Sequence, residues 1–148
     1  MRIRLSTTED AARLVPLLDQ LGYSNPVAAL TPRLERLLSH PEYAVWVAEG
    51  DDGTMLGLAV GHMVFPIEDQ PAAYLTALVV DVTVQGTGLG RRLVDVFESW
   101  ASGNAAARTV LTSATHRTAA HAFYSHLGYE QTGQRFSKRL IGPSNSCS

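Results

Sequence analysis

The chain has 148 residues, of which 45% are hydrophobic and 18% are charged, a composition typical of a folded globular domain rather than a disordered or fibrous chain. Its formal net charge of -2 at pH 7 gives no broad positive surface, so we expect no nucleic-acid partner. The single cysteine, Cys147, excludes an internal disulfide and a zinc site built from cysteines. No apolar run approaches the roughly 20 residues that span a bilayer, and the start lacks the apolar core of a secretory signal. We therefore expect a cytoplasmic protein with no membrane partner.

The first forty residues predict one strand and two helices. Residues 3–5 indicate a short strand. A helix then runs from the capping threonines and acidic residues of "STTED" to Gly22, and Pro16 predicts a kink or a break within it. The second helix is expected to begin with Thr31 as its cap and Pro32 at its first position, ahead of a buried stripe of leucines.

The rest of the chain predicts further strands and helices. First come a strand pair joined by a turn at Asp51–Gly53 and an apolar strand that ends at Val82. A helix follows, with its buried stripe from Leu89 to Trp100. The last elements are a strand in "RTVLTSA", a helix in "RTAAHAFYSHLGY" and a strand in "QRFSKRLI". The helix between the strand at Val82 and the strand around Val110 makes those two strands parallel neighbours. We therefore expect a single α/β domain over residues 1–142, followed by a flexible tail at residues 143–148.

Three glycines alternate with single residues in "VQGTGLGRRL", where a strand leads into a helix. The first amides of a helix have no partner within it and lie at the positive end of its dipole, and glycines let a ligand approach the backbone. Arg91 and Arg92 in the first helical turn oppose the dipole unless an anion lies nearby, which favours a phosphate site. From these residues alone, a tight strand-to-helix turn with solvent-facing arginines is an equally good interpretation.

Two common phosphate-binding motifs do not fit this stretch, and no metal site is indicated. The dinucleotide fingerprint G-x-G-x-x-G requires its third glycine one place later and an acidic residue about 20 positions on, which "AAARTVL" lacks. The nucleotide-triphosphate loop requires a lysine after its last glycine, and no lysine follows here.

His116, His121 and His126 are spaced by five residues, so they do not share a helix face, and we expect no metal.

The stretch resembles motif A of the GNAT superfamily of N-acetyltransferases, Q/R-x-x-G-x-G/A, with Gln85, Gly88 and Gly90 in the motif positions after the strand "LVVDV". The later stretch "LTSATHRTAAHAFYSHLGYEQTGQRFSKRL" is similar to the second half of the family, with strand, helix, "LGY" turn and strand in the same order. The resemblance covers essentially the whole chain and is strongest to the branch that includes aminoalkylphosphonate and aminoglycoside acetyltransferases. Val82 and Arg117 depart from the proline and asparagine that are frequent at these positions.

The resemblance implies the acyl-CoA N-acyltransferase fold. This fold is a mixed, twisted sheet of six or seven strands, with splayed central parallel strands and about four helices on its faces. Acetyl-coenzyme A (acetyl-CoA) would be the cosubstrate, with its pyrophosphate held by Gln85, Gly86, Thr87, Gly88, Leu89, Gly90 and Arg91. The backbone of Val80 and Val82 would pair with the pantetheine arm as an added strand would.

The resemblance also implies direct attack of a neutral primary amine, belonging to a small molecule, on the thioester carbonyl. The Val80 amide would stabilise the oxyanion that forms. Tyr124 matches the family tyrosine that protonates the leaving sulfur, and a phenol, whose ordinary pKa is about 10, carries that proton at neutral pH. Packing between a helix and the sheet is the alternative role for Tyr124.

The sequence leaves the base, the acceptor and the oligomeric state open. The candidate bases are Glu68, Asp69, His62 and His121, and water could take the proton instead; for each residue a solvated, packing or capping role is the alternative. Acetylation of a protein lysine or N-terminus and a non-catalytic acyl-CoA sensor are the alternative functions. Dimers are common among relatives, so a homodimer is expected by analogy alone.

Overall fold

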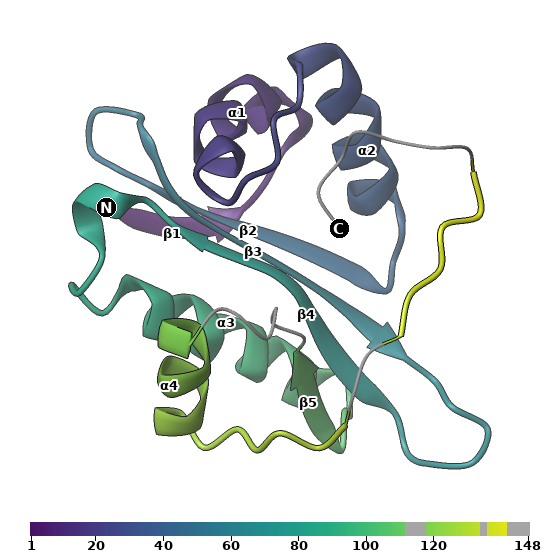
Figure 1. Cartoon of the computed structure of the whole chain (residues 1–148). Coiled ribbons are helices and arrows are strands. Elements are labelled where there is room, and N and C mark those ends of the chain that lie inside the picture. Colours follow the sequence, from purple (N-terminus) through teal and green to yellow (C-terminus); the bar gives the residue numbers. More distant parts are fainter. Residues whose placement is uncertain (112–117, 134–135, 142–148) are drawn as a thin grey trace. The chain divides into compact units, whose positions relative to one another are not determined.

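The computed structural model describes residues 1–111, 118–133 and 136–141 (Figure 1). It divides into two units, residues 1–111 and residues 112–148, and each unit is described by itself. None of the described helices is long and apolar enough to cross a bilayer.

The first unit is built on a five-stranded sheet with the strand order β1-β2-β3-β4-β5 (Figure 1). The strands are β1 (Arg2–Leu5), β2 (Tyr43–Glu49), β3 (Met55–Val64), β4 (Ala72–Val80) and β5 (Arg108–Leu111). The first four strands pair antiparallel with their neighbours, whereas β5 pairs parallel with β4. The predicted hairpin is confirmed by the pairing of β2 with β3 around Gly53, whose φ of 85° lies in the left-handed region that glycine favours. The predicted parallel pair is confirmed as well.

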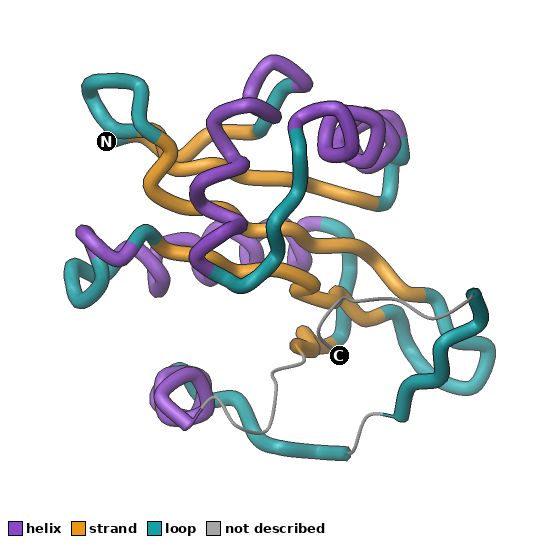
Figure 2. Tube along the Cα trace, turned by 45° about the horizontal axis from the view of Figure 1, so that its top comes forward, coloured by secondary structure: helices purple, strands orange, loops and turns teal. Residues whose placement is uncertain are grey.

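Helices cover both faces of this sheet (Figure 1, Figure 2). α1 (Ala11–Gln20) and α2 (Val27–Ser39) lie over one face, and α3 (Leu89–Gly103) lies over the other. A short 3₁₀ turn, η1 (Thr8–Asp10), leads into α1. Because α3 connects β4 to β5, it is the crossover helix that the sequence predicts.

The helices on the first face differ from the prediction in two details. α1 continues through Pro16 without a break, while the alternative prediction of a kink at Pro16 stays untested. α2 begins at Val27, ahead of the predicted cap Thr31, so Pro32 lies inside the helix. The Thr31 hydroxyl donates a hydrogen bond to the Val27 carbonyl (2.9 Å), one turn earlier. The predicted start was wrong because burial of Leu30 against the core requires the additional turn.

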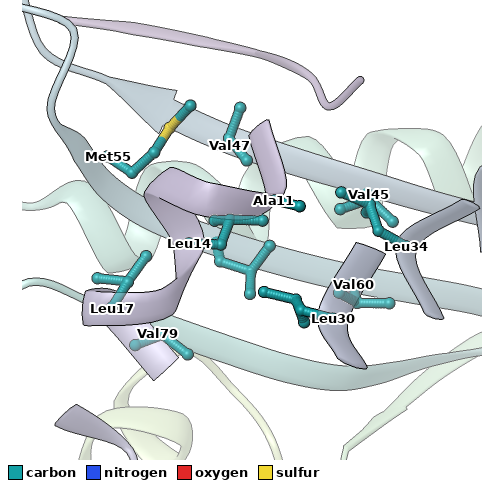
Figure 3. Packing of buried hydrophobic residues seen from close by; sticks show 11 residues of the cluster. Ala11, Leu14, Leu17, Leu30, Leu34, Val45, Val47, Met55, Val60 and Val79 are labelled. Atoms are coloured by element: carbon teal, nitrogen blue, oxygen red, sulfur yellow. The ribbon is translucent and has the colours of Figure 1, made fainter. Parts of the chain in front are cut away.

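An aliphatic core fills the space between the sheet and the two helices α1 and α2 (Figure 3). Its buried members come from both helices and from three strands: Ala11, Leu14, Leu17, Leu30, Leu34, Val45, Val47, Met55, Leu58, Val60 and Val79. Full burial of a leucine or valine side chain stabilises a fold by about 1.5–3 kcal/mol relative to exposure. This core therefore holds segments together that are far apart in the sequence.

The other face packs on α3 so closely that β3 needs glycine at two positions. A Cβ atom at Gly61 would lie 2.7 Å from Cδ1 of Phe97, and one at Gly57 would lie 2.9 Å from Cδ1 of Leu93. Phe97 and Leu93 are both fully buried, as the predicted stripe of this helix requires. This packing sets the position of α3 on the sheet, and with it the position of the loop that precedes α3.

Replacing Gly61 with alanine is expected to lower the free energy of unfolding by about 1–3 kcal/mol, because the added methyl group would push Phe97 and α3 away from the sheet. Urea unfolding measures this change. Gly103→Ala is the matched control, since a Cβ atom there meets nothing within 4 Å, and its unfolding midpoint should equal or slightly exceed that of the wild type. A Gly61→Ala variant as stable as the wild type would contradict the close packing.

The second unit contains α4 (Thr118–His126) and the segments that follow it. Gly128, with a φ of 93°, follows the end of this helix as predicted. Residues 136–141 form no strand, so the prediction of a last strand in "QRFSKRLI" is wrong over its described part. Phe136 and Leu140 are 90% and 89% exposed there, because no described strand buries them. Among the described residues the sheet thus has five strands instead of six or seven.

Several predicted features lie outside the described residues. They are the end of the strand in "RTVLTSA", the positions of His116 and Arg117, the start of "QRFSKRLI" and the tail at residues 143–148 with Cys147. The single domain over residues 1–142 stays a prediction.

Candidate functional site

The glycine loop, residues 85–90, connects the 3₁₀ turn η2 (Val82–Val84) to α3. Gly86 and Gly88 have φ values of 82° and 90°, in the left-handed region that other residues rarely adopt. A Cβ atom at either position would meet nothing within 4 Å. The backbone conformation, not crowding by the protein, therefore requires these two glycines, and it leaves the surface of the loop open.

The first amides of α3 precede the hydrogen-bonding pattern of that helix. The first of these bonds runs from the Arg92 N–H to the Gly88 carbonyl (3.1 Å), so the amides of Leu89, Gly90 and Arg91 have no acceptor within the helix. No acidic residue occupies the first turn, and the side chain of Arg91 is exposed. The loop and helix start thus combine free donors with positive charge, which is the chemistry that binds a phosphate.

β4 carries a bulge at Thr76, and beyond this bulge the described part of the chain pairs it with β3 alone. Ala77 pairs with Val60 and Leu75 pairs with Gly61, so Thr76 is the additional residue, and its hydroxyl donates to the Val60 carbonyl (3.3 Å). On the other side, β5 pairs only with residues 72–75 of β4. Residues 76–80 therefore have an edge to which no described strand is bonded.

The direction of the β4 amides follows from one hydrogen bond. The Asp81 N–H donates to the Leu56 carbonyl of β3 (2.8 Å), and backbone groups alternate in direction along an antiparallel strand. Val79 consequently faces β3, whereas the backbone groups of Val80 and Leu78 face the open edge. Val80 has the orientation that the prediction requires. Leu78, two residues earlier on the strand, has the same orientation and was not among the predicted site residues.

The junction between β4 and the glycine loop is held by α1. The Gln20 side chain donates to Asp81 Oδ2 (3.0 Å) and accepts a bond from the Val82 N–H (3.0 Å). Asp81 Oδ1 accepts from the Thr83 hydroxyl (2.6 Å) and amide (2.8 Å), and these bonds, with that from Gln20, hold the pKa of Asp81 below its usual value. The Val82 amide is thus already bonded, so a ligand could contact Val82 through its carbonyl or its exposed side chain. The Gln85 side chain returns to the Val80 carbonyl (3.3 Å).

Three of the four candidate bases lie in the first unit. Glu68 is exposed in the loop between β3 and β4. Asp69 accepts the Gln70 amide (2.7 Å) and pairs with Arg108 (2.9 Å), which lowers its pKa and makes it a weaker base. His62 is half-buried on β3 beside the ring of Tyr74 on β4, with a centroid distance of 5.7 Å.

Tyr124 and His121 both lie on α4 in the second unit, and both are half-buried. The ring of Tyr124 meets Phe123 and Tyr129 edge to face, with centroid distances of 5.4 and 6.3 Å. The Tyr129 N–H donates to the Tyr124 carbonyl (3.0 Å) in the turn that Gly128 closes. The helix and the "LGY" turn thus place the phenol ring beside two other rings, and its catalytic role stays a prediction.

The model of the acetyltransferase (GNAT) family matches residues 6–129 of the chain. The chain belongs to the GNAT family. It is an N-acetyltransferase that uses acetyl-CoA as its cosubstrate, as the resemblance of its sequence to the family implies. The expected mixed α/β fold is confirmed by the solved structures that it resembles.

Among curated proteins, an aminoglycoside N(6')-acetyltransferase type 1 from Stenotrophomonas maltophilia is 28% identical over 134 residues, covering 88% of this chain and 86% of the relative. The aminoglycoside antibiotic 6'-N-acetyltransferase from Acinetobacter haemolyticus matches in structure with a TM-score of 0.81 and 20% identity, covering 95% of this chain and 100% of that one. A further aminoglycoside N-acetyltransferase, solved in complex with CoA, has a TM-score of 0.81 and 20% identity over 93% of each chain. This last structure shows that a protein with the fold of this chain binds CoA.

Replacing Gly88 with valine is expected to weaken acetyl-CoA binding by roughly tenfold or more. A φ of 90° costs a residue other than glycine on the order of 1–3 kcal/mol, so the loop would leave the conformation that presents its amides. Isothermal titration calorimetry with acetyl-CoA measures the affinity. Gly53→Val is the matched control, because Gly53 has a similar φ of 85° but lies in the β2–β3 turn. Equal affinities of the two variants would show that the loop conformation does not contribute to binding.

Proposed function

We propose that this acetyltransferase transfers the acetyl group of acetyl-CoA to a primary amine of a small molecule. One observation carries the proposal: the open edge of β4 leads directly into the glycine loop and the start of α3. Along this path the described strands and helices leave the amides of Leu78 and Val80, and then those of Leu89 to Arg91, without acceptors. Such a row suits a ligand that carries amides followed by a diphosphate.

The proposed cosubstrate site uses this path in two parts. The backbone of Val80 and Val82 contacts the pantetheine arm, with Leu78 as an additional contact on the same edge. The pyrophosphate is held by Gln85, Gly86, Thr87, Gly88, Leu89, Gly90 and Arg91. Support comes from the left-handed glycines and from the free amides at the start of α3.

The proposed reaction is direct acetyl transfer. The amine nitrogen attacks the thioester carbon, the carbon–sulfur bond breaks, and the sulfur of coenzyme A takes a proton. The Val80 amide donates to the developing oxyanion, and Tyr124 supplies the proton to the sulfur. The proton of the amine passes to His62, Glu68, His121 or water; Asp69 is less suited because its amide and arginine partners lower its pKa.

A small-molecule acceptor is supported by the curated relative, whose name states that it acetylates aminoglycosides. The residues that are proposed to bind acetyl-CoA do not indicate which amine accepts the acetyl group.

Thiol release from acetyl-CoA, followed against a panel of amines, tests the proposed function. The panel contains aminoalkylphosphonates, polyamines, aminoglycosides, amino acids and short peptides. Turnover that depends on a small amine is the expected result. Turnover with peptides alone would instead establish a protein acetyltransferase, and acetyl-CoA binding without turnover on any amine would favour the sensor.

A further inference from the structure

The last residue of α1 forms a two-point contact with the junction between β4 and the glycine loop. Gln20 Nε2 donates to Asp81 Oδ2 (3.0 Å), and Gln20 Oε1 accepts from the Val82 N–H (3.0 Å). Both ends of one amide group are thus bonded to two successive residues of the chain. We call Gln20, Asp81 and Val82 the junction clamp.

The way in which α1 ends fixes the backbone of Gln20. The Tyr23 N–H donates to the Leu18 carbonyl (3.1 Å). The Gly22 N–H donates to the Asp19 carbonyl (3.0 Å), and together these two bonds make a Schellman motif. Gly22 supplies the left-handed residue that the motif requires, with a φ of 97°. The last turn of α1 is therefore closed, with Gln20 inside it.

Apolar packing holds the same helix against the same end of β4. Leu17 lies one turn before the end of α1 and Val79 lies near the end of β4, and both are buried members of the aliphatic core (Figure 3). The Asp81 N–H donates to the Leu56 carbonyl of β3 (2.8 Å), which fixes this end of β4 in the sheet. The junction clamp is therefore a polar contact between two segments that the core already holds together.

The turn that follows β4 depends on the junction clamp for its connection to α1. The Thr83 N–H donates to Asp81 Oδ1 (2.8 Å), and the Val84 N–H donates to the Asp81 carbonyl (3.0 Å). These two bonds lie within the turn itself, whereas the Val82 N–H donates to Gln20 on a helix that is distant in the sequence. Of these three amides, only that of Val82 is bonded to α1.

This turn separates the two parts of the proposed acetyl-CoA site. The open edge of β4 at Leu78 and Val80 precedes it, and the glycine loop, residues 85–90, follows it. A ligand that bonds to both parts gains affinity when the chain already holds them in the bound arrangement. The junction clamp is placed to hold them so, because it bonds the first residue of the turn to α1.

We infer that Gln20 is a positioning residue for acetyl-CoA. The junction clamp holds the glycine loop in line with the open edge of β4, so that one cosubstrate molecule bonds to both. Gln20 acts through Asp81 and Val82 and not through the ligand. This inference rests on the position of acetyl-CoA in the proposed function, and binding decides it without turnover.

Gln20→Met tests the inference by calorimetric titration with acetyl-CoA. Methionine has nearly the length and helix propensity of glutamine but forms neither bond. Because both bonds are exposed, we expect Kd for acetyl-CoA to rise roughly three- to tenfold. ADP carries a diphosphate but no pantetheine arm, so its Kd, measured by NMR titration, should change by less than about twofold. An unchanged Kd for acetyl-CoA, or an equal loss for ADP, would overturn the inference.

Reversing the polarity of the contact is the sharper test. Gln20→Glu places two carboxylates side by side and should raise Kd for acetyl-CoA at least as much as Gln20→Met does. In the double variant Gln20→Glu/Asp81→Asn, the asparagine amide donates to the glutamate, which still accepts from the Val82 N–H, and the asparagine oxygen still accepts from Thr83. This double variant should restore Kd to within about twofold of the wild type. A double variant that binds no better than Gln20→Glu would contradict the junction clamp.

The matched control is Gln70→Met, which changes an exposed glutamine in the loop between β3 and β4 and should leave Kd for acetyl-CoA at the wild-type value. An equal loss of affinity in this variant would show that the effect is not specific to Gln20. If the wild type binds acetyl-CoA but acetylates no amine, the proposed acceptor fails, while the Kd values still decide the role of Gln20.

Discussion

Replacing Tyr124 with phenylalanine is expected to lower kcat for acetyl transfer by roughly 10²–10⁴-fold. The substitution removes the proposed proton donor to the leaving sulfur and keeps the ring that packs on Phe123 and Tyr129. Because the loop and the edge of β4 are unchanged, the affinity for acetyl-CoA should stay at the wild-type value. Thiol release at saturating acetyl-CoA measures kcat, and calorimetry measures the affinity.

Tyr129→Phe is the matched control for this experiment. It removes a second phenol from the same unit, from the residue whose N–H bonds to the Tyr124 carbonyl, and it should retain the wild-type kcat. If Tyr124→Phe also retains kcat, then the tyrosine has a packing role and the leaving thiolate departs without a general acid. A parallel loss of kcat in both variants would indicate damage to the "LGY" turn instead.

The second large effect is on stability, at Asp10, whose side chain is only 1% exposed. Arg4 donates to both of its carboxylate oxygens (2.8 and 2.9 Å), and Arg13 donates to Oδ1 (2.7 Å). The Ser6 hydroxyl and the Thr7 amide bond to Oδ2 at 3.1 and 2.9 Å. Arg4 and Arg13 also form ion pairs with the carboxylate of Glu49 on β2. Asp10 is therefore the buried centre of a network that joins β1, η1, α1 and β2.

Asp10→Ala is expected to lower the free energy of unfolding by about 3–5 kcal/mol, because it leaves Arg4 without its main buried partner. Urea unfolding at neutral pH measures the loss. Asp95→Ala, on the exposed side of α3, is the control and should change stability by less than about 0.5 kcal/mol. Equal effects of the two substitutions would show that the network around Asp10 adds nothing to stability.

The same network predicts how stability depends on pH. The hydrogen bonds from Arg4 above all lower the pKa of Asp10 from 3.8 to about 2. Since the folded chain binds the proton more weakly than the unfolded chain, this contribution is complete above about pH 4 and is lost as the pH falls towards 2. A shift of this size corresponds to about 2 kcal/mol. Unfolding between pH 2 and pH 5 should therefore show a steeper loss for the wild type than for Asp10→Asn.

Local signals in the sequence were enough to predict several elements. Gly53 and Gly128 mark turns because a positive φ is a property of a single residue, and both have one. Gly86 and Gly88 also adopt the left-handed conformation that glycine favours, whereas the binding of a pyrophosphate by their loop stays a prediction. Local signals failed where packing outweighed them, as at the start of α2, where Pro32 lies inside the helix so that Leu30 can be buried.

The sequence by itself thus determined the order of the main elements and, through several local motifs that follow one another along the chain, the GNAT family, because each motif consists of residues that are neighbours in the chain. The tertiary structure alone decided the features that depend on strand register. The bulge at Thr76 exists because particular residues of β3 meet particular residues of β4, and the described chain leaves an edge at Leu78 and Val80 because the pairing of β5 with β4 stops at Leu75. The network around Asp10 likewise depends on Glu49 of β2, which lies 45 residues from Arg4 and 36 residues from Arg13, and no spacing along the chain indicates that these residues meet. Register and burial are set by contacts between distant segments, so they appear only when the sheet has formed.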